Sequence, residues 1–317
     1  MRRSDSNLRL PDFLIIGAMK SGTTSLSADL QTNPKIFFPS VKEPHFLTDD
    51  AVLTSTGRRR YARLFSTSID SQCRGEASTG YTKLPSIDGV PRRAKQLLKT
   101  GARFVYLVRN PIDRAISHYY HLRRSGDLTI NIDEAIRRVP EFIDYSSYAM
   151  QLRAWMNEFG PASFFVVRFE DYVSNRREVV TDICRFLNVK PQPHLIDVNA
   201  IHNGGNSAAS PRPLLKSLMR NVTRNQWYKM YVHPRMPQRL RNSLKPIVMR
   251  KSSSRIMLPN ADTLKFLADC FRDDIKQLQT MTNRQDPLWD LDAPRSRMPT
   301  REIQSDLGGL ECNSSAH

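Results

Sequence analysis

The sequence predicts an α/β fold in which parallel strands alternate with helices. Three short apolar runs carry this prediction, at residues 13–16, 104–108 and 163–169. The runs are nearly continuous, as in strands covered on both faces, whereas a strand with one wet face alternates apolar and polar residues. Helical spacing follows the first two runs. This succession is typical of βαβ units.

A glycine-bounded loop follows the first run. Gly17 ends the strand, and Gly22 precedes residues 23–30, where Leu26 and Leu30 lie four apart, as on one face of a helix. A strand, loop and helix in this order point backbone N–H groups and the positive end of a helix dipole at one place, which favours an anion. Further donors lie in the loop and at the helix start: Lys20, Ser21, Thr23, Thr24 and Ser25.

The spacing of Gly17 and Gly22 matches the nucleoside-triphosphate loop, Gly-x-x-x-x-Gly-Lys-Ser/Thr. The lysine does not match, because Thr23 stands in its place and Lys20 comes three residues earlier. This difference argues against ordinary ATP or GTP hydrolysis. A nucleotide or sugar kinase of the same fold would need that lysine and carboxylates for Mg²⁺. This sequence lacks the lysine, so a kinase is the disfavoured alternative.

A second polar segment begins where the run 104–108 ends. Arg109 follows the strand, and Asn110 and Pro111 suit the N-cap and first residue of a helix. Open α/β sheets bind ligands at this edge. The guanidinium of Arg109 and the hydroxyl of Ser117 suit a phosphate monoester. From the residues alone, the alternative that Arg109 has a purely structural role at an interface stays open.

These two segments resemble the signatures of the sulfotransferases that use 3′-phosphoadenosine 5′-phosphosulfate as donor. In that family the first loop holds the 5′-phosphosulfate, and the arginine and serine of Arg-x-Pro-x-x-Arg-x-x-Ser-x-Tyr bind the 3′-phosphate. The resemblance covers roughly residues 11–290. It implies one domain with a P-loop-like three-layer fold, a mostly parallel sheet and helices on both faces. Residues 1–10 and 291–317 are expected to be loose tails.

The segment Lys42-Glu43-Pro44-His45 resembles a Lys-Glu-x-His-Phe segment of glycan-type sulfotransferases, in which the glutamate is the catalytic base. The resemblance therefore makes Glu43 the expected base, with Lys20 stabilising charge on the leaving phosphate. His45 is the alternative base, because its reference pKa of about 6.5 lies nearer neutrality than the value of about 4.3 for glutamate. An apolar setting would raise the pKa of Glu43; otherwise Glu43 mainly orients the acceptor hydroxyl.

The sequence departs from the family at two places. Ala77 occupies the position of a lysine that helps at the reaction centre, and Lys83 or Lys42 is the expected substitute. The neighbouring Glu76 is either structural or faces the acceptor. A late Lys-Gly-Arg segment that covers the nucleotide is also missing, and we expect Arg212 to supply its cation.

The chain of 317 residues has 48 Lys and Arg but only 31 Asp and Glu, which gives a formal net charge of +17. Residues 212–255 hold twelve Lys or Arg and no Asp or Glu. This stretch is a solvated surface, a contact for an anionic acceptor or an acidic membrane, or, least favoured, a nucleic-acid face. A non-catalytic basic protein that binds anions or nucleic acid through this stretch is the alternative from another functional class.

The implied reaction is sulfuryl transfer to a hydroxyl, or less favourably an amine, of a glycan, glycolipid or small molecule. No metal is expected. The sequence has no apolar run of about 18 residues, which a membrane-spanning helix would need. Its four cysteines lie far apart, which fits a reducing compartment. We therefore expect a cytoplasmic enzyme, with residues 212–255 as its contact if it binds a membrane.

Overall fold

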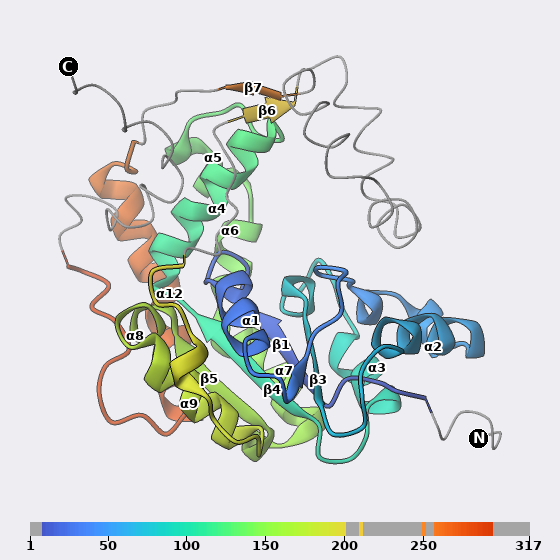
Figure 1. The fold of residues 1–317 in the computed structure, drawn as a ribbon. Helices are drawn as coiled ribbons and strands as arrows, with labels where there is room; N and C mark the ends of the chain where they lie inside the picture. The colour runs from blue at the N-terminus through green and yellow to red at the C-terminus, as the bar shows by residue number, and fades with distance from the viewer. Residues whose placement is uncertain (1–7, 201–208, 212–248, 252–256, 294–317) are drawn as a thin grey trace, which may run out of the picture.

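The computed structural model describes residues 8–200, 209–211, 249–251 and 257–293. A sheet of five parallel strands in the order β2-β3-β1-β4-β5 lies between two layers of helices (Figure 1). The predicted three-layer α/β fold is confirmed. The strands of this sheet are β1 (Phe13–Gly17), β2 (Ile36–Phe37), β3 (Cys73–Ala77), β4 (Arg103–Val108) and β5 (Phe164–Arg168).

The helices of the described residues follow the strands in the expected alternation. They are α1 (Thr23–Gln31), α2 (Ser55–Ala62), α3 (Val90–Leu97), α4 (Pro111–Ser125), α5 (Ile132–Arg138), α6 (Glu141–Asp144), α7 (Tyr148–Phe159), α8 (Phe169–Ser174), α9 (Arg176–Phe186) and α12 (Ala261–Met281). A separate antiparallel pair is formed by β6 (Ala209–Pro211) and β7 (Met249–Lys251).

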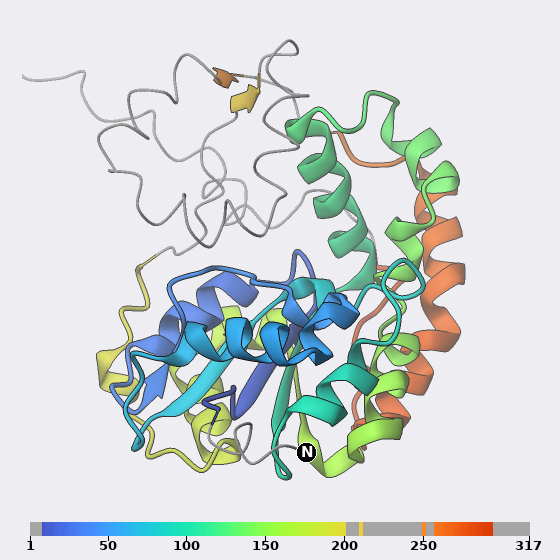
Figure 2. The same ribbon diagram turned by 90° about the vertical axis from the view of Figure 1, so that its right-hand side faces the viewer.

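The sheet separates two hydrophobic cores. Alternate residues of each strand enter opposite cores, since successive side chains of a strand point to opposite faces. On β1, Leu14 and Ile16 pack with α4, α7 and α12, whereas Phe13 and Ile15 pack with α1, α8 and α9. Among the described helices, the longest is α12, which lies against α4 and α7 (Figure 2). Burial on both faces explains why the strand sequences read as continuous apolar runs.

Local signals set the ends of the helix that follows β4. The side chain of Asn110 accepts hydrogen bonds from the backbone N–H groups of Ile112 at 3.1 Å and Asp113 at 3.4 Å. Pro111 fills the first helical position, where a missing N–H costs nothing. Gly126 ends α4 in a left-handed conformation. The helix predicted from Asn110 and Pro111 therefore forms as expected.

Some elements differ from the sequence prediction. The strand β3 was not predicted, because its sequence is not an apolar run. Its Arg74 is paired in the folded protein with Asp12, through two hydrogen bonds of 2.9 and 2.8 Å. Residues 145–147 separate the short helix α6 from α7. Asn175 has a non-helical backbone and separates α8 from α9.

The packed domain is slightly larger than the range 11–290. Leu10 and Leu291 are both buried in the core that contains Leu14. Arg9 donates a hydrogen bond to the Ser68 carbonyl at 2.5 Å. Residues expected in the loose tails therefore begin and end the described domain.

Candidate functional site

The two motifs meet at the carboxyl edge of the sheet. The strands β1 and β4 are neighbours, so the segments that follow them emerge side by side. Arg109, which directly follows β4, is only 1% exposed, and its Nη1 donates a hydrogen bond to the carbonyl oxygen of Lys20 at 3.3 Å. The fold thus brings together the glycine loop and the arginine that the sequence predicted as parts of one anion site.

An aromatic ring joins the two motifs. The guanidinium carbon of Arg109 lies 5.2 Å from the ring centroid of Phe169. The same ring covers Gly22, where a Cβ would lie 2.7 Å from a ring carbon. Gly22 also has a φ of 86°, so it is required both by its left-handed conformation and by lack of space. The sequence analysis did not identify Phe169 as a site residue.

The backbone of Arg109 is fixed by surrounding helices. The hydroxyl of Tyr148 donates to the Arg109 carbonyl at 2.8 Å and lies 3.3 Å from its N–H. The next amide, that of Asn110, donates to Glu170 at 2.9 Å, and the indole of Trp289 donates to the same carboxylate at 3.0 Å. These contacts hold the backbone at the start of α4 in a fixed position.

The glycine loop has the properties of a phosphate site. Gly22 provides no side-chain cap for α1, and the first turn contains no acidic residue, so the helix start favours an anion. The hydroxyl of Ser21 is buried and has no hydrogen-bond partner among the described residues. Such a group usually indicates a missing ligand or water. Thr23, Thr24 and Ser25 begin α1 as predicted.

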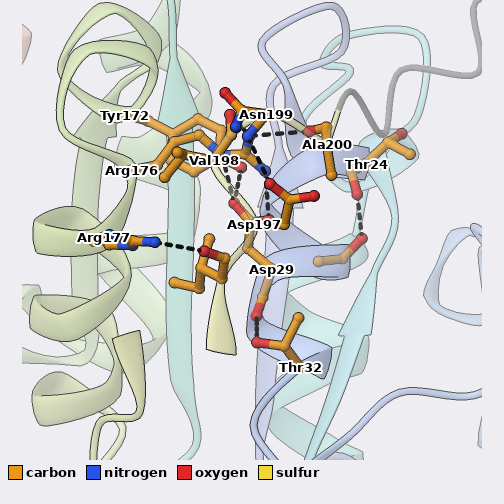
Figure 3. Close-up of polar contacts among 12 residues, drawn as sticks. Thr24, Asp29, Thr32, Tyr172, Arg176, Arg177, Asp197, Val198, Asn199 and Ala200 are labelled. Carbon is orange, nitrogen blue, oxygen red and sulfur yellow. Dashed lines mark hydrogen bonds and ion pairs between the residues drawn. The ribbon is translucent and has the colours of Figure 1, made fainter. Parts of the chain in front are cut away.

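A buried ion pair anchors α1 (Figure 3). Asp29 is 1% exposed and accepts from Arg176 Nε at 2.9 Å and Nη2 at 2.6 Å, and from the Tyr172 hydroxyl at 2.5 Å. Arg176 Nη1 also donates to the carbonyls of Val198 and Ala200, at 2.8 and 3.0 Å. The helix behind the glycine loop is thereby tied to α8, α9 and residues 198–200.

Glu43 and His45 form a pair in the segment between β2 and β3. Glu43 Oε2 lies 3.3 Å from His45 Nε2 and accepts from the Thr79 hydroxyl at 3.1 Å. Burial acts to raise the pKa of Glu43, but the hydrogen bond and charge of His45, with Lys42 and Thr79, outweigh burial and hold the pKa below its usual value. Glu43 is therefore ionised at neutral pH, and the raised pKa that would make it a strong base is not found.

Three of the predicted catalytic residues share an unusual backbone conformation. Lys20, Glu43 and His45 have φ values of 68°, 47° and 54°, in the left-handed region. This conformation costs about 1–2 kcal/mol for a residue with a Cβ. Strain of this kind persists only where the surrounding contacts hold it, and it clusters at functional sites.

Two lysines lie near Glu43. Burial lowers the pKa of Lys83, while the charge of Glu43 acts in the opposite direction. Lys42 is exposed, and its charge helps to lower the pKa of Glu43. Both substitutes expected for the lysine at Ala77 are therefore within electrostatic reach of Glu43, and only Lys83 is partly buried.

Besides burial, the charges of Lys20 and Lys83 both lower the pKa of His118 on α4. Burial, followed by the charges of Arg114 and Lys83 and, more weakly, Lys20, lowers the pKa of His118 to about 2. His118 is thus neutral at physiological pH. Ser117, the adjacent residue on α4, is half-buried. Arg212, the cation expected to cover the nucleotide, lies outside the described residues.

A match over most of the sequence shows which protein family the chain belongs to. Residues 10–240 match the family model described as the sulfotransferase domain. The chain belongs to the sulfotransferase family. The sulfotransferase from Alicyclobacillus acidocaldarius has a similar fold, with a TM-score of 0.59, 23% identity, and coverage of 87% of this chain and 97% of that one.

Two curated relatives of this sulfotransferase are longer proteins. Human carbohydrate sulfotransferase 15 is 25% identical over 57% of this chain and 44% of its own length. Mouse bifunctional heparan sulfate N-deacetylase/N-sulfotransferase 4 is 29% identical over 57% of this chain and 23% of its own length. The chain therefore spans less than half of each relative.

None of the helices in the described residues combines the length and the apolar character that a membrane-spanning helix needs. The same residues contain no group of three or more His, Cys, Asp or Glu side chains placed to hold a metal ion.

Proposed function

We propose that the protein transfers a sulfuryl group from 3′-phosphoadenosine 5′-phosphosulfate to an acceptor hydroxyl, or less favourably to an amine. The observation that carries this proposal is the hydrogen bond between Arg109 and the Lys20 carbonyl, which unites the two phosphate motifs in one site. The donor, when bound, supplies an activated sulfuryl group on a phosphate. A kinase remains disfavoured because Thr23 replaces the lysine after Gly22.

The residues of the donor side fit a nucleotide with two separate phosphate positions. The helix start at Gly22, with Ser21 and residues 23–25, would hold the 5′-phosphosulfate, and Lys20 would stabilise the charge that grows on the leaving phosphate. Arg109 and Ser117 would bind the 3′-phosphate. Arg212 stays a prediction, because it lies outside the described residues.

Glu43 is the proposed proton acceptor. His45 Nε2 faces the Glu43 carboxylate, which can only accept, so this nitrogen carries the proton in the observed contact. The lone pair of a neutral His45 is then on Nδ1, which is buried and has no partner among the described residues. An acceptor proton cannot reach it there. Because the pKa of Glu43 is lowered, Glu43 mainly orients the hydroxyl and takes its proton as the oxygen–sulfur bond forms.

The cation near the reaction centre is proposed to be Lys83. Its partial burial and its electrostatic interaction with Glu43 support this role, since an ammonium in a poorly solvated position stabilises developing negative charge more strongly. Lys42 is exposed and remains the second candidate.

The acceptor is proposed to be a glycan or glycolipid, with a small molecule as the alternative. The names of the curated relatives, which include a carbohydrate and a heparan sulfate sulfotransferase, support a glycan. A cytoplasmic location and a membrane or acceptor contact through residues 212–255 stay predictions. Of that stretch, the structure describes only residues 249–251.

Donor labelled in the sulfuryl group tests the proposal. The protein is incubated with this donor, a chelator, and either desulfated heparan, desulfated chondroitin or a cell extract. We expect label on an acceptor with the wild type and its loss with Glu43→Gln. Donor-independent binding of anions, with no labelled product from any acceptor, would favour the non-catalytic binding protein.

A further inference from the structure

A buried carboxylate lies beneath the segment that carries Glu43 and His45. Glu76, on β3, has no exposed surface. It accepts hydrogen bonds from Ser78 Oγ and Tyr81 Oη, both at 2.6 Å, and from the hydroxyl of Tyr61. Its position excludes direct contact with an acceptor, which was one of the two alternatives left open by the sequence. Glu76 instead fixes the direction of three O–H bonds.

Two of these hydroxyls pass the orientation on to the backbone of the catalytic segment. Ser78 Oγ accepts from the His45 N–H at 3.2 Å, and Tyr81 Oη accepts from the Leu47 N–H at 3.4 Å. A hydroxyl has one proton, and here it is donated to Glu76. The oxygen lone pairs are therefore free to accept from the two amides. The carboxylate sets the polarity of both chains of hydrogen bonds.

The same short segment of chain also holds the reactive side chains. Between Ser78 and Tyr81, Thr79 donates to Glu43, and Gly80 lies against the imidazole, where a Cβ would be 2.7 Å from His45 Nδ1. The left-handed conformations of Glu43 and His45 require such support from their surroundings. Residues 78–81 thus contact residues 43–47 at the side chains and at the backbone.

We propose that Glu76 is a positioning residue, which holds the Glu43–His45 pair in its reactive place through the hydroxyls of Ser78 and Tyr81. The catalytic part of this inference rests on the proposed function, whereas the structural part does not. Glutamine at this position keeps the size of the side chain but replaces one acceptor oxygen by a donor. Tyr61 donates to Oε2, whereas Ser78 and Tyr81 both donate to Oε1. The amide oxygen can keep Ser78 and Tyr81, but without the carboxylate charge both hydrogen bonds, and with them both chains to the backbone, become weaker.

The test uses Glu76→Gln with two readouts. Hydrogen exchange of the His45 and Leu47 amides is measured on the free protein, which needs no acceptor, and we expect faster exchange at both. Turnover with labelled donor and desulfated heparan is expected to fall roughly 10- to 100-fold, the scale of a small misplacement of a reactive group. Affinity for adenosine 3′,5′-bisphosphate should stay within about twofold, since Glu76 touches neither donor motif.

A double-mutant cycle separates positioning from general destabilisation. If Glu76 acts through Glu43, adding Glu76→Gln to Glu43→Gln should cost little further turnover. An equal loss in both backgrounds, or unchanged exchange at residues 45 and 47, would overturn the inference. Tyr61→Phe is the matched control, because it removes a hydroxyl that donates to Glu76 but keeps the ring that stacks on Phe46. The His45 and Leu47 amides donate to Ser78 and Tyr81, so their exchange should stay unchanged in this variant.

Two further variants apply if Glu76→Gln does not fold. Ser78→Ala and Tyr81→Phe each remove one chain, and each should expose only its own amide, at His45 or Leu47. If neither does, the inference fails. An absence of sulfuryl transfer in the wild type would instead refute the proposed function, while the exchange result would still decide whether Glu76 holds the segment.

Discussion

The side chain of Arg109 donates a hydrogen bond to the main-chain oxygen of Lys20, although 89 residues separate them in the sequence. The contact exists because β1 and β4 are adjacent and parallel, so that both residues emerge at one edge of the sheet. It orients an arginine toward the loop that begins α1. The site is therefore assembled by strand order and by the register of the sheet.

Arg109→Ala should weaken binding of adenosine 3′,5′-bisphosphate by roughly 1.5–3 kcal/mol, the scale of a hydrogen bond to a charged group. Calorimetry measures this loss. The exposed Arg138→Ala on α5 is the control and should change the affinity little. Equal affinity of the wild type for ATP and for the 3′-phosphorylated nucleotide would contradict the proposed donor.

Lys20→Ala should lower turnover more than it weakens binding of the product nucleotide. The reason is that the ammonium is proposed to stabilise charge that grows only in the transition state. The rate constant at saturating donor, compared with the dissociation constant of the bisphosphate, measures the difference. An unchanged rate constant would remove Lys20 from the mechanism.

Glu43→Gln should preserve the fold and donor affinity but lower turnover by roughly 10²–10⁴, the range for loss of a general base. His45→Asn should lose less, because the imidazole is proposed to orient Glu43. The lowered pKa of Glu43 means that its ionised form persists on acidification to below the usual carboxyl value. Any acid limb of the rate profile caused by Glu43 should therefore lie below the usual range of a glutamate carboxyl. A more damaging His45→Asn would reverse the assignment.

Lys83→Met should lower turnover by about 10²-fold, as for loss of one group that stabilises developing charge. Its lowered pKa also predicts that Lys83 reacts with acetic anhydride at lower pH than a lysine model peptide does. Mass spectrometry of the modified protein gives this midpoint. The sign follows from burial, which disfavours the ammonium. If Lys42→Met costs more turnover than Lys83→Met, then Lys42 is the cation.

Asp29→Asn should lower the free energy of unfolding by about 3–5 kcal/mol, because it leaves Arg176 partly buried without its carboxylate. Urea unfolding measures the change. The matched control is Asp182→Asn, which breaks the exposed pair with Arg185 and should cost only about 0–1 kcal/mol. A similar small loss for both variants would show that the Asp29 pair contributes little stability.

Much of the fold could be predicted because buried parallel strands leave a direct pattern in the sequence. β1 and β4 are apolar on both faces, and Asn110 and Pro111 mark a helix start. β3 left no such pattern, since Arg74 and Glu76 are stabilised by side chains distant in the sequence, Asp12 and Tyr61. A strand whose polar groups are paired only in the folded state cannot be identified from periodicity.

The candidate site was predictable only in part for a similar reason. Its charged residues follow strand ends, so their approximate place could be inferred. Phe169 could not be predicted, because its contact with Arg109 depends on the register of β4 and β5. Val108 pairs with Arg168 at the ends of these strands, so the residues that follow, Arg109 and Phe169, lie at the same level. The lowered pKa of Glu43 likewise depends on Thr79, which comes from another segment.

The left-handed backbone at Lys20, Glu43 and His45 affects how the protein would respond to selection for higher thermal stability. Glycine adopts this conformation without steric cost, so glycine at any of the three positions would relieve local strain. Selection for thermal tolerance alone should therefore collect glycine at these positions, and the surviving variants should be robust but inactive. A selection that also demands sulfated product should exclude them, which would expose a direct conflict between durability and catalysis in this chain.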